Sequence, residues 1–156
     1  MPKARILLTL LRTTGEWLTI LVITLLSGCS TYVIEPGNYN VWDGSLPESE
    51  IHPCSHPGPP EFETTWKLTD DVVSQLEEDL PQLRRLKADM CCLEGWKIDD
   101  LNKYHRVYYG IVVRGKRLVY ISNGGAFICD CGPSCWAVLY DPSARLFYNL
   151  RFGGLA

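Results

Sequence analysis

The sequence has no excess of positive charge. Its 15 Lys and Arg residues are outnumbered by 18 Asp and Glu residues, and the net charge at pH 7 is −3. The chain also contains no long basic run. Nucleic-acid binding depends on clustered Lys and Arg side chains that neutralise phosphates. The composition therefore excludes a typical nucleic-acid-binding protein, and we expect no nucleic-acid partner.

Catalytic motifs are scarce as well. The chain has three His residues, and His105, the one outside the Pro-rich front segment, falls within a segment expected to be a strand. No Gly-x-Ser-x-Gly motif occurs, so the elbow that presents a nucleophilic Ser in many hydrolases is not predicted. The acidic runs Glu77–Asp79 and Asp99–Asp100 are interpreted as a solvated helix face and a turn. These patterns assign no catalytic, cofactor-binding or metal-binding residue, and they favour a non-enzymatic protein.

The chain also lacks a long apolar run. Its most apolar segment, from Trp17 to Leu26, is shorter than the about 20 apolar residues that span a bilayer. It follows a basic start with Lys3, Arg5 and Arg12, and small residues come directly after it. A basic start, an apolar core and small residues before a cleavage point are the parts of a secretory leader.

The end of this segment, Leu26-Ser27-Gly28-Cys29, resembles the lipobox of bacterial lipoproteins. In that family the leader is cut before the Cys, which then carries the lipid. The resemblance implies a signal peptide over residues 1–28, a palmitate-bearing lipid on Cys29, and a lipid-anchored protein of the cell membrane. Because Ser30 is not the Asp that tends to retain lipoproteins at the inner membrane, it implies the outer membrane, facing the periplasm, in a Gram-negative cell. A cleaved leader without lipid, or a signal anchor extended through residues 6–11, are the alternatives.

Cysteine is the most informative residue type in the remainder of the chain. With Cys29 set aside, six of the seven cysteines are left, and an even number in an exported domain predicts disulfide bonds. The preferred arrangement joins the Cys91-Cys92 pair to the Cys129–Cys135 loop, and Cys54 ties down the front segment. Six cysteines allow 15 pairings, so the connectivity stays open. The disulfide candidates are Cys54, Cys91, Cys92, Cys129, Cys131 and Cys135.

The same cysteines offer an alternative chemistry. The loop Cys131-Gly132-Pro133-Ser134-Cys135 resembles the thioredoxin active site, but three residues separate its cysteines instead of two. Thiolates of Cys129, Cys131 and Cys135, with one of Cys91 or Cys92, supply the four ligands of a structural zinc site. His52, Cys54 and His56 alternate along the chain and share one face of an extended segment, an arrangement that suits a soft metal ion. A thiol-redox or zinc-binding protein that uses the Cys129–Cys135 loop is thus the alternative to a disulfide-bonded binding domain.

Patterning divides the rest of the chain in two. Residues 29–61 hold most of the prolines and predict an extended tether, part of which packs along the domain. A domain over residues 62–156 begins with an amphipathic helix over 70–88. Its apolar positions are Val72, Leu76, Leu80, Leu83 and Leu86 or Lys87, and Thr69 or Asp70 caps its start. Pro81 should kink or split this helix.

The C-terminal part of the domain reads as strands and turns. Strands are expected over 104–113, 117–122, 136–140 and 145–151, with turns over 114–116 and 141–144. Val107, Tyr109, Ile111 and Val113 should share one face of the sheet. The tyrosines of the first hairpin, Tyr104, Tyr108, Tyr109 and Tyr120, are interpreted as packed against the helix or across strands, with exposed binding anchors as the alternative. The predicted fold is α+β: one kinked helix on an antiparallel sheet of about four strands, tied by disulfides.

The domain also resembles a group of small uncharacterised bacterial exported proteins. The shared pattern includes a helix start with Trp66, Leu68 and Thr69, the run from Tyr108 to Ile121, a Trp-x-Val-x-Tyr-Asp-Pro segment over 136–142, and a terminal Phe-Gly-Gly-Leu-Ala. The resemblance implies no activity. The sequence thus predicts a membrane-anchored envelope lipoprotein whose domain binds an envelope protein or other envelope component.

Overall fold

The computed structural model describes residues 37–47, 51, 57–88, 94–123 and 132–153. All of them belong to the compact unit formed by residues 34–156. Within the described residues, no helix is long and apolar enough to cross a membrane. Residues 1–28, predicted to be a signal peptide, Cys29 and the cysteines other than Cys135 lie outside the described residues.

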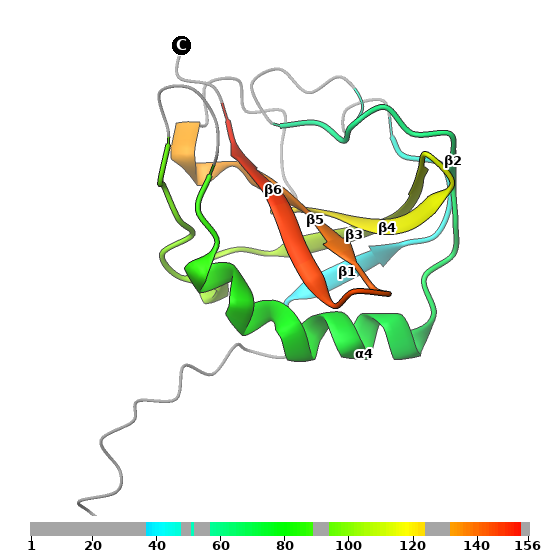
Figure 1. Cartoon of the computed structure of the whole chain (residues 1–156). Coiled ribbons are helices and arrows are strands. Elements are labelled where there is room, and N and C mark those ends of the chain that lie inside the picture. The colour runs from blue at the N-terminus through cyan, green and yellow to red at the C-terminus, as the bar shows by residue number, and fades with distance from the viewer. Residues whose placement is uncertain (1–36, 48–50, 52–56, 89–93, 124–131, 154–156) are drawn as a thin grey trace, which may run out of the picture. The chain divides into compact units, whose positions relative to one another are not determined.

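The described unit is an α+β fold, with one α-helix packed on a six-stranded mixed sheet (Figure 1). Short 3-10 turns occur at residues 80–85, 101–103 and 132–134. The strands are β1 (Tyr39–Trp42), β2 (Thr64–Thr65), β3 (Arg106–Val113), β4 (Lys116–Ser122), β5 (Trp136–Asp141) and β6 (Leu146–Phe152), and the helix is α4 (Asp70–Asp79). In Figure 1, α4 lies across the bottom of the view, and the chain reaches it along the top and right-hand side from residue 57.

The helix forms where the apolar spacing predicts it, but it is shorter. Leu76, Leu80 and Leu83 are fully buried, whereas Val73, not Val72, fills the first buried position. The α-helix ends at Asp79, and the chain continues as a 3-10 turn over Leu80–Arg85 with Pro81 near its start. This confirms the predicted split, which occurs because proline has no N–H to donate to the preceding turn. Thr69 occupies the N-cap position, but its side chain makes no capping hydrogen bond.

The prediction of an antiparallel sheet of about four strands is wrong in number and in direction. The strand order is β1-β3-β4-β5-β6, and β2 also pairs with β3. The expected strands form the antiparallel ladder β3-β4-β5-β6. However, β1 runs parallel to β3, with Tyr39 opposite Arg106 and Trp42 opposite Tyr109. It lies in the Pro-rich segment interpreted as a tether, but its own four residues contain no proline and can form a strand.

The outer row of the sheet consists of two short strands on the same side of β3. β1 pairs with Arg106–Tyr109, and β2 pairs antiparallel with Ile111 and Val112. Gly110 lies at the junction, where the Trp66 N–H donates to the Gly110 carbonyl (3.0 Å). A Cβ on Gly110 would overlap the Trp66 carbonyl oxygen and lie 3.2 Å from Leu68 Cδ2. The absence of a side chain at this position therefore lets the incoming chain cross the sheet edge.

Both faces of the sheet are covered. One face, here called the helix face, packs against α4 and includes Tyr108 and Tyr140, whose hydroxyls reach carboxylates on that helix. The opposite face carries a second apolar cluster of Tyr109, Ile111, Leu118, Tyr120, Ala137 and Leu139, covered by Leu46 and Phe62. Val107 and Val113 pack against this cluster, which confirms the face predicted for alternate residues of β3. The front segment thus supplies part of the core.

A β-bulge interrupts β6. The register against β5 shifts between Ala137 and Leu139, and Asn149 adopts φ 57°. The extra residue breaks the strict alternation, so Phe147, Leu150 and Phe152 are buried while Tyr148 and Asn149 are exposed. Leu146 is also exposed, at 56 %.

Candidate functional site

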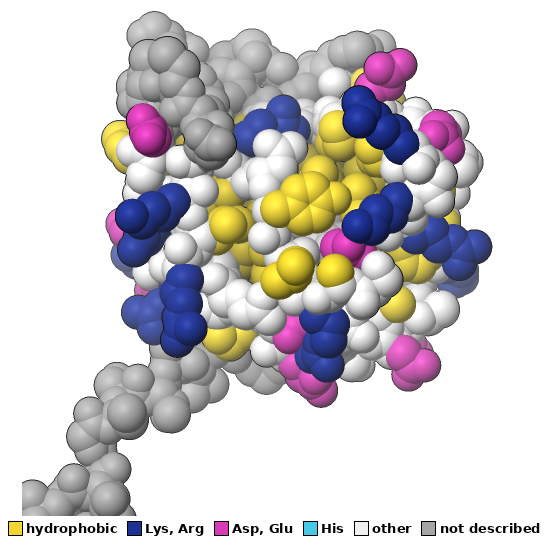
Figure 2. Space-filling model, in the orientation of Figure 1, with side chains coloured by type: hydrophobic (Ala, Val, Ile, Leu, Met, Phe, Trp, Pro, Cys, Tyr) yellow, Lys and Arg dark blue, Asp and Glu magenta, His cyan; other side chains and the backbone are white. Residues whose placement is uncertain are grey.

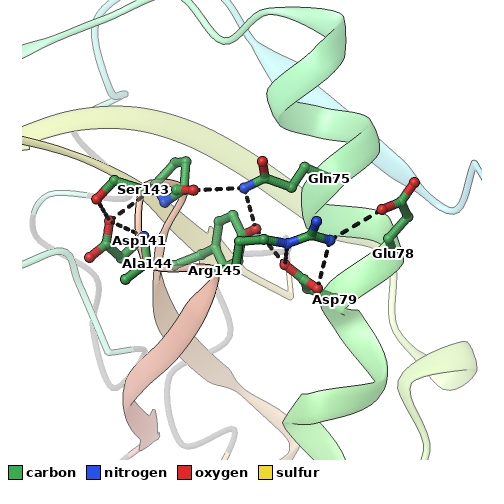
Figure 3. A network of polar contacts seen from close by, with 9 residues as sticks. Gln75, Glu78, Asp79, Asp141, Ser143, Ala144 and Arg145 are labelled. Atoms are coloured by element: carbon green, nitrogen blue, oxygen red, sulfur yellow. Dashed lines mark hydrogen bonds and ion pairs between the residues drawn. The ribbon is translucent and has the colours of Figure 1, made fainter.

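A network of charged and polar side chains joins α4 to the β5–β6 turn (Figure 3). Arg145, from the turn, donates to both carboxylate oxygens of Asp79 (2.9 and 3.0 Å) and to Glu78 (3.1 Å). The Tyr140 hydroxyl donates to the same Asp79 carboxylate (2.7 Å). Gln75 donates to the Tyr140 oxygen and to the Pro142 carbonyl, both at 2.8 Å. These bonds connect one face of α4 with the end of the sheet.

The electrostatics of this network are those of a stable ion pair. The hydrogen bonds from Arg145 lower the pKa of Asp79, although burial of the carboxylate opposes them, and Tyr140 assists. Burial raises the pKa of Tyr140 to about 12. At neutral pH Asp79 is therefore ionised and Tyr140 is protonated, so neither group is poised to exchange a proton. We conclude that this network fastens the helix to the sheet and has no features of an acid–base site.

A second buried charge contacts the same C-terminal turn of α4 through Glu77. Arg106 is fully buried; it donates to the Tyr108 oxygen (2.9 Å) and the Leu101 carbonyl (3.4 Å) and pairs with Glu77 (3.5 Å). The Tyr108 hydroxyl also donates to Glu77. Burial raises the pKa of Tyr108 well above its ordinary value. Each polar group meets a partner of opposite charge or a hydrogen-bond acceptor, which is what a buried charge requires.

The structure corrects the interpretation of the acidic run Glu77–Asp79 as a solvated helix face. Only Glu78 is exposed; Asp79 is 8 % exposed and Glu77 is half-buried. No local pattern signals this burial, because the partners, Arg145 in the β5–β6 turn and Arg106 in β3, lie far along the chain. Asp100 fits the predicted turn, since its carboxylate accepts from the Asn102 N–H (3.0 Å) at the start of a 3-10 turn.

The tyrosines and His105 have structural positions. Tyr108, Tyr109 and Tyr120 are buried, which confirms that the group is packed. Tyr104 is half-buried and meets Trp136 edge to face. His105 lies directly before β3 instead of within it, is exposed, and has its Nδ1 3.1 Å from the Asn38 side-chain oxygen.

The structure describes only Cys135 among the six candidate cysteines. Cys135 is buried and disulfide-bonded, and its partner lies outside the described residues. The proposed connectivity, the zinc site, and the positions of Cys29, Cys54, Cys91, Cys92, Cys129 and Cys131 all fall outside the described residues, as do His52 and His56. Within the described part of the chain, no three His, Cys, Asp or Glu side chains gather in a way that could hold a metal ion.

A groove of about 390 Å³ lies between β1 and the start of α4. Its walls are Tyr39, Val41, Trp42 and Asp43 on one side and Lys67, Leu68, Asp70, Val73 and Ser74 on the other. Val41 and Trp42 are 40 % and 44 % exposed. Lys67 bonds Asp43 (2.7 Å) across one end of the groove. A concave surface with apolar walls and a few charges has the character of a binding site.

The opposite edge of the sheet also exposes apolar side chains. Figure 2 shows them in the middle of the face viewed, over β5 and β6, with Lys and Arg side chains around them. Leu146 and Tyr148 are the exposed large apolar residues of β6. A shallow cavity of about 540 Å³ nearby is lined by Pro81, Gln82, Arg85, Leu86 and Phe147. Sequence patterns assigned a role to neither edge, because a hydrophobic residue in a strand is normally expected to face the core.

No protein-family model, curated protein or solved structure matches this chain.

Proposed function

We propose that this protein is a lipid-anchored lipoprotein of the bacterial cell envelope whose α+β domain binds another protein without catalysing a reaction. The anchor depends on the order of basic start, apolar core, small residues and Cys29 in the sequence. The single structural observation that supports a binding role is the exposure of Val41 and Trp42 beside a groove at the sheet edge. In contrast, the charged networks described above are engaged in holding the fold together.

Protein interfaces are rich in aromatic residues, and their energetic centres are often Trp and Tyr. Trp42 fits this pattern. Its indole N–H donates to the Ser45 carbonyl (2.8 Å), and its ring lies 6.2 Å from that of Tyr109. These contacts hold the ring in place while 44 % of the residue stays exposed. An ordered, exposed ring loses little conformational entropy on binding, which favours a docking role.

Metabolic labelling with an alkyne analogue of palmitate tests the anchor. The wild-type chain expressed in a Gram-negative host should incorporate the label and sediment with membranes, and Cys29→Ala should lose both properties. Cys54→Ala is the matched control and should keep them. Label retained by Cys29→Ala, or membrane attachment of its cleaved form, would contradict the lipobox interpretation.

The binding role is tested separately by affinity purification. Full-length protein is cross-linked in intact cells and purified from detergent-solubilised envelopes, and the proteins recovered are quantified. We expect one stoichiometric envelope protein with the wild type and a clear loss with Trp42→Ala. Recovery of the same proteins at the same level with both chains would refute a binding role for this edge.

The alternative is a thiol-redox or zinc-binding function of the Cys129–Cys135 loop. Zinc binding requires free thiolates and thiol–disulfide exchange requires an accessible sulfur, whereas Cys135 is disulfide-bonded and buried. This observation favours a structural role for Cys135. Thiol titration of the native and the denatured protein, together with a zinc assay, separates the two functions: reactive thiols or stoichiometric zinc would support the alternative, and their absence would remove it.

A further inference from the structure

The outer side of β1 is an open sheet edge within the described part of the chain. The Asn38 carbonyl accepts from the Arg106 N–H (3.1 Å), so the alternation of the ladder turns the main chain of Asn40 and Trp42 toward β3 as well. The N–H and C=O groups of Tyr39 and Val41 then point away from the sheet. The described residues offer them no hydrogen bond. Such an edge is a template for one more strand.

The two edges of the sheet differ in how well they suit strand addition. On β6, the bulge at Asn149 displaces the ladder in the middle of the strand. Bulges of this kind protect an edge from further pairing. β1 has no register shift, and its exposed edge adjoins the groove. A segment pairing with β1 would therefore place alternate side chains over the groove wall.

The charges around the groove select the sign of the partner. Asp43, Lys67 and Asp70 line it, which leaves one excess negative charge. Asp43 pairs with Lys67, whereas Asp70 has no ion pair in the described part of the chain. The hydrogen bond and charge of Asp43 raise the pKa of Lys67, and the charge of Asp70 adds to the effect, so the three groups act together. A second copy of this chain docked through β1 would bring two acidic rims together, which is unfavourable.

We propose that the β1 edge and the adjoining groove bind an extended, cationic segment of another protein, which adds to the sheet as a further strand. Alternate residues of that segment are Lys or Arg; their aliphatic stems lie along Val41 and their charged ends reach Asp70. The residues between them are apolar and pack beside Trp42. This inference names the partner of the binding site proposed above and therefore rests on that function.

A defined peptide tests the inference with the full-length protein in detergent. The probe is a fluorescein-labelled hexapeptide, Thr-Lys-Val-Lys-Val-Thr, and the analogue Thr-Glu-Val-Glu-Val-Thr reverses its charge. Fluorescence anisotropy gives both dissociation constants. We expect the Lys peptide to bind and the Glu analogue to bind at least about tenfold more weakly, which corresponds to about 1.4 kcal/mol. Absence of binding by the Lys peptide at millimolar concentration, or equal binding of both, overturns the proposal.

Main-chain methylation distinguishes strand addition from loose adhesion. One version of the Lys peptide carries N-methyl groups on both Val residues, and another carries them on both Lys residues. Since only alternate residues of an added strand bond to β1, one version should lose binding and the other should keep most of it. Equal affinity of both versions and the parent peptide would show that no strand forms, and would overturn the inference.

Substitutions in the protein locate the site. Val41→Lys places a positive charge beside the Lys side chains of the peptide and removes an apolar contact on the open edge; we expect binding at least about tenfold weaker, a loss of about 1.4 kcal/mol. Asp70→Asn should weaken the Lys peptide severalfold and leave the Glu analogue unaffected or improved. Leu146→Lys, at an exposed apolar position on the other edge, is the matched control and should leave binding within about twofold, or about 0.4 kcal/mol. A larger loss with Leu146→Lys than with Val41→Lys refutes the assignment to β1.

The outcome is separable from that of the broader proposal. If the peptide fails while an envelope protein is still recovered in a Trp42-dependent manner, the partner is not a cationic strand and only this inference falls. If the peptide binds as described but no envelope protein is recovered, the edge is a strand-binding site whose partner lies outside the envelope, and the broader proposal falls instead.

Discussion

The strongest test of the fold is Gly110→Ala, which adds a single methyl group. A Cβ at this position would overlap the Trp66 carbonyl oxygen and approach the Trp66 carbonyl carbon to 3.1 Å. Backbone cannot swing aside as a flexible side chain does. The segment at Trp66 must therefore lift away from β3, which breaks its N–H bond to Gly110 (3.0 Å).

The Trp66 side chain would be affected together with its main chain. Its indole N–H lies between the carbonyls of Ile111 (3.1 Å) and Leu118 (3.0 Å), and Arg117 lies 5.5 Å from the ring centroid. Overpacking costs about 1–3 kcal/mol, and each hydrogen bond lost adds about 1 kcal/mol. The expected loss is about 3–5 kcal/mol, a large part of the about 5–15 kcal/mol that stabilises a typical domain. For a domain of this size, Tm should fall by about 10–20 °C.

Gly115→Ala is the matched control. Gly115 lies in the β3–β4 turn with φ 73°, and a Cβ there meets nothing within 4 Å. Its substitution costs only the left-handed strain, about 1–2 kcal/mol. Urea unfolding followed by circular dichroism, with thermal melts, measures both variants. If Gly110→Ala loses no more stability than Gly115→Ala, the close crossing of Trp66 over β3 is refuted.

Three further predictions concern the helix and its network. Leu80→Ala removes a fully buried side chain and should lower the unfolding free energy by about 2–5 kcal/mol, whereas Leu146→Ala, at an exposed position, should change it by less than about 0.5 kcal/mol; similar losses in urea melts would contradict the described core. Arg145 lowers the pKa of Asp79, so the ionised carboxylate stabilises the fold above pH 3.8, the ordinary Asp value, and this contribution is lost as the pH falls through the lower folded-state pKa. Asp79→Asn should therefore be less stable than wild type at pH 7, and the difference in unfolding free energy should shrink at pH 2–3 in urea titrations. A difference that stays constant with pH would refute the ion pair. Because burial raises the pKa of Tyr140 to about 12, its contribution to the unfolding free energy should disappear as the pH rises above 10, where the unfolded side chain ionises. Tyr140→Phe should reduce this alkaline loss of stability. An alkaline stability profile that the substitution leaves unchanged would count against the buried hydroxyl.

Local patterns predicted the helix and the main antiparallel strands well. The β3–β4 and β5–β6 hairpins lie within one or two residues of the expected ranges, because alternating Val, Ile, Tyr and Leu between turn residues depend on short-range chemistry. The two-residue strand β2 is too short to show any period. β1 was obscured by the prolines around it, although Tyr39–Trp42 contains none.

The candidate site was less predictable than the fold. The exposed aromatic that supports a binding role, Trp42, has no distinguishing motif around it. Its exposure follows from the position of β1 at the edge of the sheet, which depends on pairing with residues more than sixty positions away. The same holds for Asp79, which was interpreted as part of a solvated helix face, and for Arg106, whose burial no sequence pattern predicted.

The sequence by itself determined the candidate lipid anchor, the acidic character, the split helix at Pro81 and the order of the main strands. Each of these depends on neighbours within a few turns of chain, where spacing and residue type carry the physics. Only the tertiary structure decided that β1 pairs parallel to β3, that position 110 requires glycine, and that one sheet edge beside a groove stays open within the described residues. These features depend on contacts between segments far apart in the chain, and no local pattern records which distant segment will fill a space or leave it exposed.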